Sequence, residues 1–304
     1  MNYAKLLLFG EYTVLYGGDC LELPYKRYGG MLTLEEPVEG EEQLARWSNR
    51  QLLEFYHHLL KVLNTGRYRM SFDTEQMAID LSRGLWFKSD IPGQSGFGSS
   101  GALVAAFVNR YGVNVLSEHT DNLKQLFASL ENNFHGNSSG MDPLVSFLNI
   151  PVAKTSAGLL TPVLQNQFAD DIKLFLVHAR QERNTRELIH AFKNRMADAG
   201  FQKEYMDTIL PHTNRVIQSI LSHDDDSWYD HLKVLSQLQK VFYSDIIPDI
   251  IPVKFDSDIF HLKLLGSGGG FMLGFTRDYK KTVDFFNTAG ISVNRIRHSD
   301  LILA

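Results

Sequence analysis

The stretch GQSGFGSSGALVAAFVNRY, residues 93–111, joins a glycine-rich loop directly to an apolar segment with helical spacing. The glycines of the loop are Gly93, Gly96 and Gly98. Glycine adopts backbone angles that are closed to other residues, so main-chain N–H groups in such a loop can approach an anion closely. Leu103, Phe107 and Tyr111 recur at i, i+4 and i+8, which predicts a helix whose positive dipole end faces the loop. The stretch therefore predicts either a phosphate-binding loop or a plain turn that starts a helix.

Two known phosphate-binding motifs fit this loop poorly. Gly93 and Gly98 have the spacing of the glycines in a Walker P-loop, but Ser99 and Ser100 follow where that motif requires lysine and then serine or threonine. The glycine order is also wrong for a dinucleotide fingerprint, and no convincing first Rossmann strand precedes Gly93. If the loop binds phosphate, another part of the chain must supply the cation.

The size and composition are those of a globular protein. The 304 residues fit about two domains, and the contents of 44% hydrophobic and 21% charged residues are ordinary. No apolar run approaches the roughly 20 residues that span a bilayer, and the only cysteine, Cys20, is expected to be a small buried residue in a reducing compartment. The net charge of −5 argues against nucleic-acid binding. We therefore expect a cytoplasmic protein with a small-molecule substrate and no nucleic-acid or membrane partner; a homodimer is left open.

The spacing of apolar residues predicts a mixed α+β chain. Strands are expected at residues 4–9, 173–177, 261–265, 271–275 and 291–295. Helices are expected at residues 41–64, at 121–134, over most of 185–239 and from about Lys280 onward. A change of composition places one domain at residues 1–165 and a second at residues 166–304. The acidic run at residues 224–226 is expected to begin a solvated helix rather than to hold a metal.

Glycine-bearing segments recur along the chain. Those around Gly10, Gly96 and Gly268 each join apolar elements, which suggests that they contribute to one shared site. A fourth segment, HGNSSGMD at residues 135–142, presents a carboxylate after two glycines.

These segments hold the residue types that phosphoryl transfer from ATP requires. That reaction needs a place for the phosphates, a divalent ion, a cation near the transferred group and a carboxylate that receives the acceptor's proton. The loop from Gly96 to Ser100 can hold phosphates, and the hydroxyl of Ser100 can hold magnesium together with Glu131. Lys5 can supply positive charge, and Asp142 can act as the base.

Each of these residues also has an ordinary structural interpretation. Lys5 could be a surface lysine of a short strand, and Glu131 could lie on the polar face of its helix. The Ser100 hydroxyl could bind a backbone amide, and Asp142 could cap a helix that begins at Pro143. Taken alone, the residue types leave both interpretations open.

Five segments, in order, resemble the GHMP kinase superfamily. Three are similar to its three motifs: KLLLFGEYTVLYGG at 5–18, IPGQSGFGSSGALVAAF at 91–107 and LLGSGGGFMLGF at 264–275. Two more, ENNFHGNSSGMDPLVS at 131–146 and ERNTRELIHAFKNRM at 182–196, are most similar to segments of the mevalonate kinase family within it. The resemblance spans nearly the whole chain. It implies the α+β GHMP kinase fold, with an N-terminal domain like ribosomal protein S5 domain 2 and a ferredoxin-like C-terminal domain.

Carried over position by position, the resemblance implies a role for each matching residue. The catalytic pair would be Asp142, as the base, and Lys5. The ATP site would comprise Gly93, Gly96, Phe97, Gly98, Ser99, Ser100 and Gly268. The substrate site would comprise Glu11, Tyr12, Arg183 and Thr185. Magnesium (Mg²⁺) would be bound by Ser100 and Glu131.

The resemblance also implies a reaction. It predicts an ATP-dependent kinase that transfers the γ-phosphoryl group to the 5-hydroxyl of mevalonate, in isoprenoid precursor synthesis. The alternatives are another GHMP kinase, acting on phosphomevalonate, a sugar or homoserine, and a non-catalytic nucleotide-binding relative.

Three positions depart from the family pattern. Tyr12 stands where many mevalonate kinases have histidine, which leaves the acceptor open. Ser138 replaces the usual proline. Gly101 replaces an alanine and is expected only to loosen the start of its helix, by ~1 kcal/mol, without affecting the chemistry.

Overall fold

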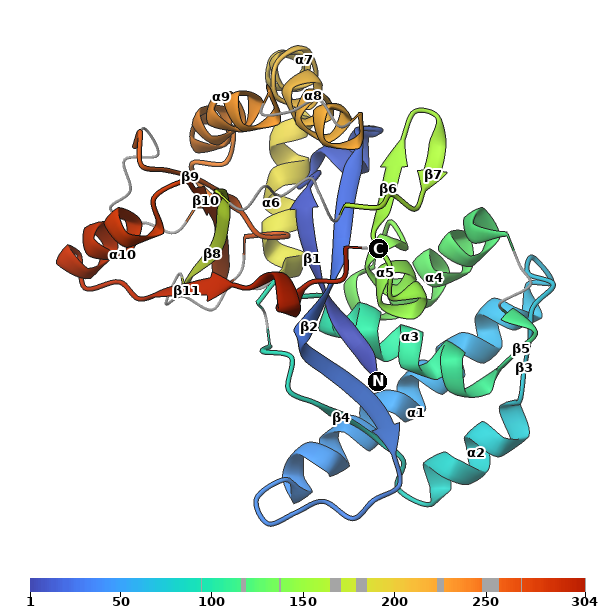
Figure 1. Cartoon of the computed structure of the whole chain (residues 1–304). Coiled ribbons are helices and arrows are strands. Elements are labelled where there is room, and N and C mark those ends of the chain that lie inside the picture. Colours follow the sequence, from blue (N-terminus) through green and yellow to red (C-terminus); the bar gives the residue numbers. More distant parts are fainter. Residues whose placement is uncertain are drawn as a thin grey trace. The chain divides into compact units, whose positions relative to one another are not determined.

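A computed structural model describes residues 1–93, 95–115, 119–136, 138–164, 171–178, 185–222, 227–247, 257–268 and 270–303 (Figure 1). The chain divides into two compact units that are interleaved in sequence. Unit 1 comprises residues 1–5, 24–92 and 98–149. Unit 2 comprises residues 6–23, 93–97 and 150–304. Strands β1 (Asn2–Phe9) and β2 (Cys20–Thr33) contribute residues to both units.

Unit 1 is mainly helical. Its helices are α1 (Glu42–Asn64), α2 (Thr74–Ser82), α3 (Ser99–Tyr111), α4 (Thr120–His135) and α5 (Met141–Leu148). Strand β4 (Trp86–Ser89) pairs antiparallel with the end of β2, and β3 (Ser71–Phe72) pairs with β5 (Gly112–Val113). Helix α1 buries Leu52, Phe55 and Leu59, whose spacing puts them on one face of the helix.

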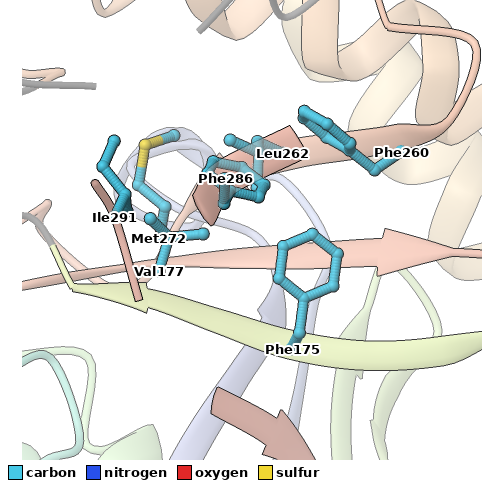
Figure 2. Close-up of a cluster of buried hydrophobic side chains, with 7 residues drawn as sticks. All are labelled: Phe175, Val177, Phe260, Leu262, Met272, Phe286 and Ile291. Carbon is cyan, nitrogen blue, oxygen red and sulfur yellow. The ribbon is translucent and has the colours of Figure 1, made fainter. Parts of the chain in front are cut away.

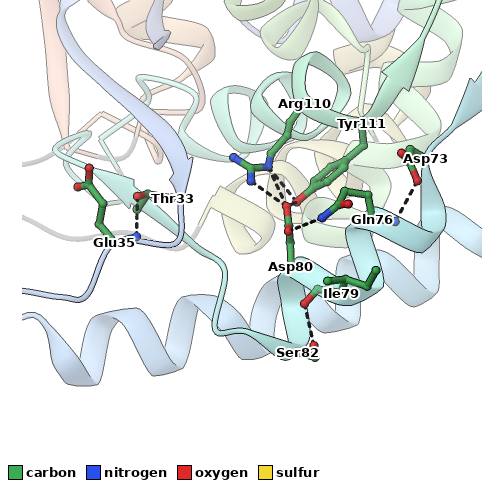
Figure 3. Close-up of polar contacts among 9 residues, drawn as sticks. All are labelled: Thr33, Glu35, Asp73, Gln76, Ile79, Asp80, Ser82, Arg110 and Tyr111. Carbon is green, nitrogen blue, oxygen red and sulfur yellow. Dashed lines mark hydrogen bonds and ion pairs between the residues drawn. The ribbon is translucent and has the colours of Figure 1, made fainter.

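A buried carboxylate connects α2 to the end of α3 (Figure 3). Asp80 accepts hydrogen bonds from Arg110 Nη2 at 2.8 Å and from the Tyr111 hydroxyl at 2.8 Å, and Gln76 Nε2 donates to its other oxygen at 2.8 Å. Burial acts to raise the pKa of Asp80, but the hydrogen bonds from Arg110 and Tyr111 outweigh it and hold that pKa below its ordinary value. The cluster is fully paired, and we interpret it as a structural connection.

Besides the sheet that contains β2 and β4, the structure has a second sheet, which lies in unit 2 together with most of the remaining helices. The sheet is antiparallel with strand order β11-β8-β10-β9. Its strands are β8 (Lys173–His178), β9 (Phe260–Leu264), β10 (Phe271–Thr276) and β11 (Val293–Ile296). The helices are α6 (Thr185–Met196), α7 (Ala199–Asp207), α8 (Ile209–Leu221), α9 (Ser227–Phe242) and α10 (Tyr279–Thr288).

The shorter elements of unit 2 include two more strands. Strand β6 (Val152–Thr155) pairs with the start of β2, and β7 (Gly158–Leu160) pairs with β6. The 3₁₀ turns are η1 (Thr13–Tyr16) and η3 (His298–Asp300).

The core between the second sheet and α10 follows from strand alternation (Figure 2). Phe175 and Val177 point to one face of β8, where they meet Phe286 of α10. Gly274 lies opposite Phe175 in the neighbouring strand, and a Cβ at Gly274 would come within 2.2 Å of the Phe175 ring. Only glycine leaves room for that ring.

The elements expected from the sequence are confirmed. Each predicted strand and helix in the described residues occurs within a few positions of its expected bounds, and the long helical region becomes α6, α7, α8 and α9. Cys20 is buried and free. The domain boundary at residue 165 stays a prediction, and the acidic run at 224–226 lies outside the described residues. Within the described parts of the chain, no helix is long and apolar enough to cross a membrane.

Candidate active site

Lys5 and Asp142 form an ion pair within unit 1, with Lys5 Nζ 3.1 Å from Asp142 Oδ2. The Lys5 side chain is only 4% exposed, whereas that of Asp142 is 28% exposed. Asp142 lies in the first turn of α5, where the helix dipole favours a negative charge. The N-cap of α5 is Gly140, so the interpretation of Asp142 as a helix cap is wrong. The surface interpretation of Lys5 is also wrong, because this lysine is buried.

The main chain at Gly98 lies against this ion pair. Gly98 is the N-cap of α3 and has a left-handed conformation, with φ of 73°. A Cβ at this position would come within 2.7 Å of Lys5 Cγ and 3.1 Å of Asp142 Oδ2. The start of α3 therefore lies beside the lysine and the carboxylate.

Gly101 brings the starts of α3 and α5 together. A Cβ on Gly101 would lie 2.8 Å from both the backbone carbon and the Cβ of Asp142, and 2.8 Å from the nitrogen of Pro143. Gly101 thus allows the backbone that carries Asp142 to approach α3 closely, a contact that helix propensity does not describe. That Gly101 leaves the chemistry unaffected stays a prediction.

Glu131 occupies a buried position beside these residues and is 3% exposed. Ser100 Oγ donates a hydrogen bond to Glu131 Oε1 at 2.8 Å, and Ser138 Oγ donates to Glu131 Oε2 at 2.5 Å. Burial raises the pKa of Glu131 to about 7, and the nearby charge of Asp142 acts in the same direction. The interpretation of Glu131 as a polar-face residue is therefore wrong.

The donor set at Glu131 suits a hard divalent cation. Carboxylate and hydroxyl oxygens are the ligands that Mg²⁺ prefers, and proteins often bind it through one or two carboxylates together with substrate phosphates. Glu131 forms no ion pair within the described residues; the charge of Lys5 acts to lower its pKa, and an added cation would act in the same direction. No group of three or more histidine, cysteine, aspartate or glutamate residues in those parts of the chain could hold a metal by itself. The residues present therefore fit Mg²⁺ that is bound together with phosphate.

Glu11, expected at the substrate, is buried within unit 2 and 2% exposed. Lys263 Nζ donates to Glu11 Oε1 and also to the carbonyl of Leu264 at 2.7 Å. Gln239 Nε2 donates to Glu11 Oε2 at 3.4 Å, and the Tyr243 hydroxyl donates to the Glu11 carbonyl at 3.0 Å. The carboxylate thus has partners inside the unit at both oxygens, and a substrate role for Glu11 stays a prediction.

Tyr12 is also buried in unit 2, at 5% exposure. Its hydroxyl donates to the carbonyl of Ser267 at 2.9 Å, and its ring packs against Phe192 with centroids 4.4 Å apart. The hydroxyl therefore holds the third glycine-rich segment, between β9 and β10. Whether Tyr12 affects the choice of substrate stays a prediction.

The two glycine-rich segments of unit 2 contact each other. A Cβ at Gly96 would lie 2.6 Å from the Leu265 carbonyl oxygen, and one at Gly266 would lie 3.2 Å from the Gly96 carbonyl oxygen. The Phe97 side chain is fully buried and packs on Phe271, with ring centroids 5.3 Å apart. The Phe97 side chain is thus not available to a ligand.

The remaining predicted positions can be placed only in part. At Gly93, a Cβ would meet nothing within 4 Å, and Ser99 is the first residue of α3. Gly268 has φ of 87° and donates its N–H to the Leu265 carbonyl at 3.2 Å. Thr185 begins α6, and Arg183 lies outside the described residues.

Sequence reasoning missed Lys263 and the contact that Ser138 makes. Lys263 lies between two leucines in strand β9, directly before the third motif, and a charge flanked by apolar residues in a strand is a signal of a buried partner. Ser138 was distinguished only as a departure from proline, and its bond to Glu131 depends on tertiary contact.

Residues 58–149 match a family model described as the GHMP kinases N terminal domain. The matched segment contains Gly98, Ser100, Glu131 and Asp142. No curated protein sequence matches the chain significantly.

Solved structures of similar fold cover nearly the whole chain. Mevalonate kinase from L. major, in complex with R-mevalonate, has a TM-score of 0.58 at 15% identity, over 97% of this chain and 94% of that one. Mevalonate kinase from Methanococcus jannaschii has a TM-score of 0.57 at 16% identity, over 97% and 96% of the two chains. Phosphomevalonate kinase from Streptococcus pneumoniae, in complex with phosphomevalonate and AMPPNP, has a TM-score of 0.60 at 14% identity, over 96% and 98%.

These findings confirm the GHMP kinase fold, and the matched segment is similar to the N-terminal domain of the GHMP kinases. Identities of 14–16% show the fold alone and do not distinguish between acceptors.

Proposed function

We propose that this protein is an ATP-dependent kinase that transfers the γ-phosphoryl group of ATP to the 5-hydroxyl of mevalonate. The observation that carries the proposal is the Lys5–Asp142 ion pair, at 3.1 Å, against the main chain of Gly98. A lysine, a reachable carboxylate and the N-terminus of a helix are the groups that phosphoryl transfer needs in one place.

In the proposed mechanism, the N–H groups at the start of α3, from Gly98 to Ser100, bind phosphate oxygens of ATP. Lys5 stabilises negative charge on the transferred group, and Asp142 orients the acceptor hydroxyl by accepting its hydrogen bond. As the acceptor oxygen bonds to the γ-phosphorus, the bond to the β-phosphate oxygen breaks, ADP leaves with that electron pair, and the hydroxyl proton passes to Asp142. Because bonding to the incoming oxygen comes late in a loose transition state, a carboxylate suffices as proton acceptor.

Ser100 and Glu131 are the residues that would hold Mg²⁺. When bound, Mg²⁺ would offset the negative charge of the phosphate groups. The Ser100 hydroxyl already contacts the Glu131 carboxylate at 2.8 Å, so the two donor groups come from α3 and α4 and lie side by side before any ligand binds.

Mevalonate is the proposed acceptor because the segments at residues 131–146 and 182–196 are most similar to the mevalonate kinase family. A phosphorylated acceptor would require an additional basic cluster beside Asp142, and the sequence around Asp142 has none. The sites expected for the acceptor include Glu11 and Tyr12, so measurement of acceptor choice also tests those two assignments.

The test measures ADP release with mevalonate, phosphomevalonate, homoserine and galactose in parallel, with and without Mg²⁺. We expect Mg²⁺-dependent turnover with mevalonate. Turnover with galactose alone or phosphomevalonate alone would contradict the assignment of mevalonate as the acceptor, but it would leave the assignment as a kinase intact. Nucleotide binding without turnover on any of the four acceptors would favour the non-catalytic alternative.

A further inference from the structure

Ser138 makes contacts that the usual family residue, proline, cannot make. Its hydroxyl donates to Glu131 Oε2 at 2.5 Å and accepts from the Gly140 N–H at 2.9 Å. Its own N–H donates to Asn132 Oδ1 at 2.7 Å. Proline has neither a hydroxyl nor an N–H group, so none of the three bonds could form with proline at this position.

The bond from Ser138 to Glu131 helps to fix the orientation of the Glu131 carboxylate. One carboxylate oxygen is held by Ser100, at the start of α3, and the other by Ser138, in the turn before α5. A buried carboxylate held at both oxygens by hydroxyls from two separate elements has one orientation, so it need not be ordered when a cation arrives. Groups that orient metal ligands in this way are a large part of a site's affinity.

Ser138 also connects Glu131 to the element that carries Asp142. The Ser138 hydroxyl accepts from the N–H of Gly140, and Gly140 is the N-cap of α5, two residues before Asp142. A single hydroxyl therefore links the carboxylate suited to a cation with the turn that places the proposed base.

We propose that Ser138 is a positioning residue that orients Glu131 for a divalent cation bound with nucleotide. The inference rests on the proposed function, because it takes Glu131 as a ligand of the magnesium that accompanies ATP. It assigns a role to Ser138, which the family resemblance marks only as a serine in place of the usual proline.

The test uses Mn²⁺ as the probe, with its binding to the full-length chain followed by loss of the free-ion EPR signal in the presence of AMPPNP. Ser138→Ala removes the hydroxyl but keeps the N–H to Asn132. We expect its Mn²⁺ affinity to fall by about 10-fold or more, the usual effect of losing a group that orients a metal ligand. Ser138→Thr keeps a hydroxyl, and we expect its affinity to stay within about 3-fold of the parent on the same basis.

Ser139→Ala is the matched control. Its hydroxyl accepts from the Met141 N–H at 3.3 Å, so it makes the same kind of turn bond as Ser138 but has no bond to Glu131 among the described contacts. Circular dichroism checks that each variant folds. If Ser138→Ala does not fold, Ser138→Cys replaces it, since a thiol of similar size is only a weak donor.

The outcomes separate this inference from the proposed function. Unchanged Mn²⁺ affinity in folded Ser138→Ala, or an equal loss in Ser139→Ala, would overturn the inference and leave the kinase assignment intact. A Ser138-dependent affinity in a protein that turns over none of the four acceptors would support the inference while the catalytic proposal fails. No Mn²⁺ binding by the parent protein would overturn the inference together with the magnesium assignment.

Discussion

Two buried glutamates, one in each unit, differ in how their charge is balanced. Glu11 in unit 2 and Glu131 in unit 1 are 2% and 3% exposed. Glu11 has the ammonium group of Lys263 against one carboxylate oxygen, and Lys263 itself is fully buried. Glu131 has two serine hydroxyls and no ion pair within the described residues, and burial raises its pKa to about 7.

The difference indicates what each carboxylate is for. Burying a charge without a counter-charge costs free energy, and a protein retains such a group only where another interaction or a function offsets that cost. Glu11 has partners within unit 2 at both carboxylate oxygens, and these contacts connect the loop after β1 to α9 and β9. Glu131 has no ion pair among the described residues, so an added cation would favour its charged form, which is consistent with the proposed magnesium role.

The largest expected effect comes from breaking the balance at Glu11. Lys263→Met removes the buried counter-charge and should lower the free energy of unfolding by about 3 to 5 kcal/mol, because an unpaired charge then remains buried. Urea unfolding at pH 7 measures the change. Glu11→Gln combined with Lys263→Met should recover most of the loss, since neither charge is then present.

Two results bear on this expectation. Lys203→Met, which breaks the exposed ion pair between Lys203 and Asp207 in α7, is the matched control and should change stability little. A double variant as unstable as Lys263→Met alone would show that the packing of the lysine, and not its charge, stabilises unit 2.

The second expected effect is at Glu131 and has the opposite sign, because removing its charge should stabilise the folded protein. Its pKa in the folded protein, about 7, lies above the ordinary value of 4.5, so the folded state binds more protons than the unfolded state between those pH values. The contribution of Glu131 to stability is therefore fully present below pH 4.5 and lost as the pH rises through 7. Glu131→Gln removes this dependence.

We expect metal-free Glu131→Gln to be more stable than the parent at pH 8 by about 1 to 3 kcal/mol, from 1.36 kcal/mol per unit of pKa, and close to it at pH 4.5. Urea unfolding in EDTA at the two pH values measures this. A variant that is less stable than the parent at pH 8 would mean that the folded protein already stabilises the charge of Glu131, as it does that of Glu11.

The smallest effect concerns the packing that places Asp142 beside this cluster. Gly101→Ala gains ~1 kcal/mol of helix propensity, but the added Cβ would lie 2.8 Å from the Asp142 backbone, and overpacking costs typically ~1 to 3 kcal/mol. We expect a net loss of about 1 kcal/mol in thermal or urea unfolding, together with slower turnover because Asp142 shifts.

Gly200→Ala is the control for helix propensity alone. Gly200 lies in the first turn of α7, where a Cβ would meet only Asp198 Oδ1, at 3.3 Å, so this variant should be as stable as the parent or more stable. If Gly101→Ala behaves like Gly200→Ala, close packing of α3 on α5 is not what positions Asp142.

Much of the fold and part of the site could be predicted from the sequence. Apolar periodicity placed the helices and strands because it depends on local geometry, and the ordered motifs indicated Lys5, Ser100, Glu131 and Asp142. The structure brings these four together in unit 1. Their catalytic and metal-binding roles stay predictions.

The missed features share a physical cause, which is that each depends on a tertiary contact between residues without a local pattern. Glu11 and Lys263 are 252 positions apart, and nothing near either residue predicts the other. The close approach of Gly101 to Asp142 depends on how tightly α3 and α5 pack, and helix propensity does not describe that contact. The bond from Ser138 to Glu131 depends on the turn before α5.

The most direct test of the central claim is the turnover of Asp142→Asn with ATP, Mg²⁺ and mevalonate, alongside its affinity for AMPPNP. Asparagine keeps the size of the side chain but cannot accept the hydroxyl proton. The account predicts unchanged nucleotide affinity and turnover reduced by at least ~100-fold, the scale of general-base catalysis. Near-normal turnover in the folded variant would contradict it.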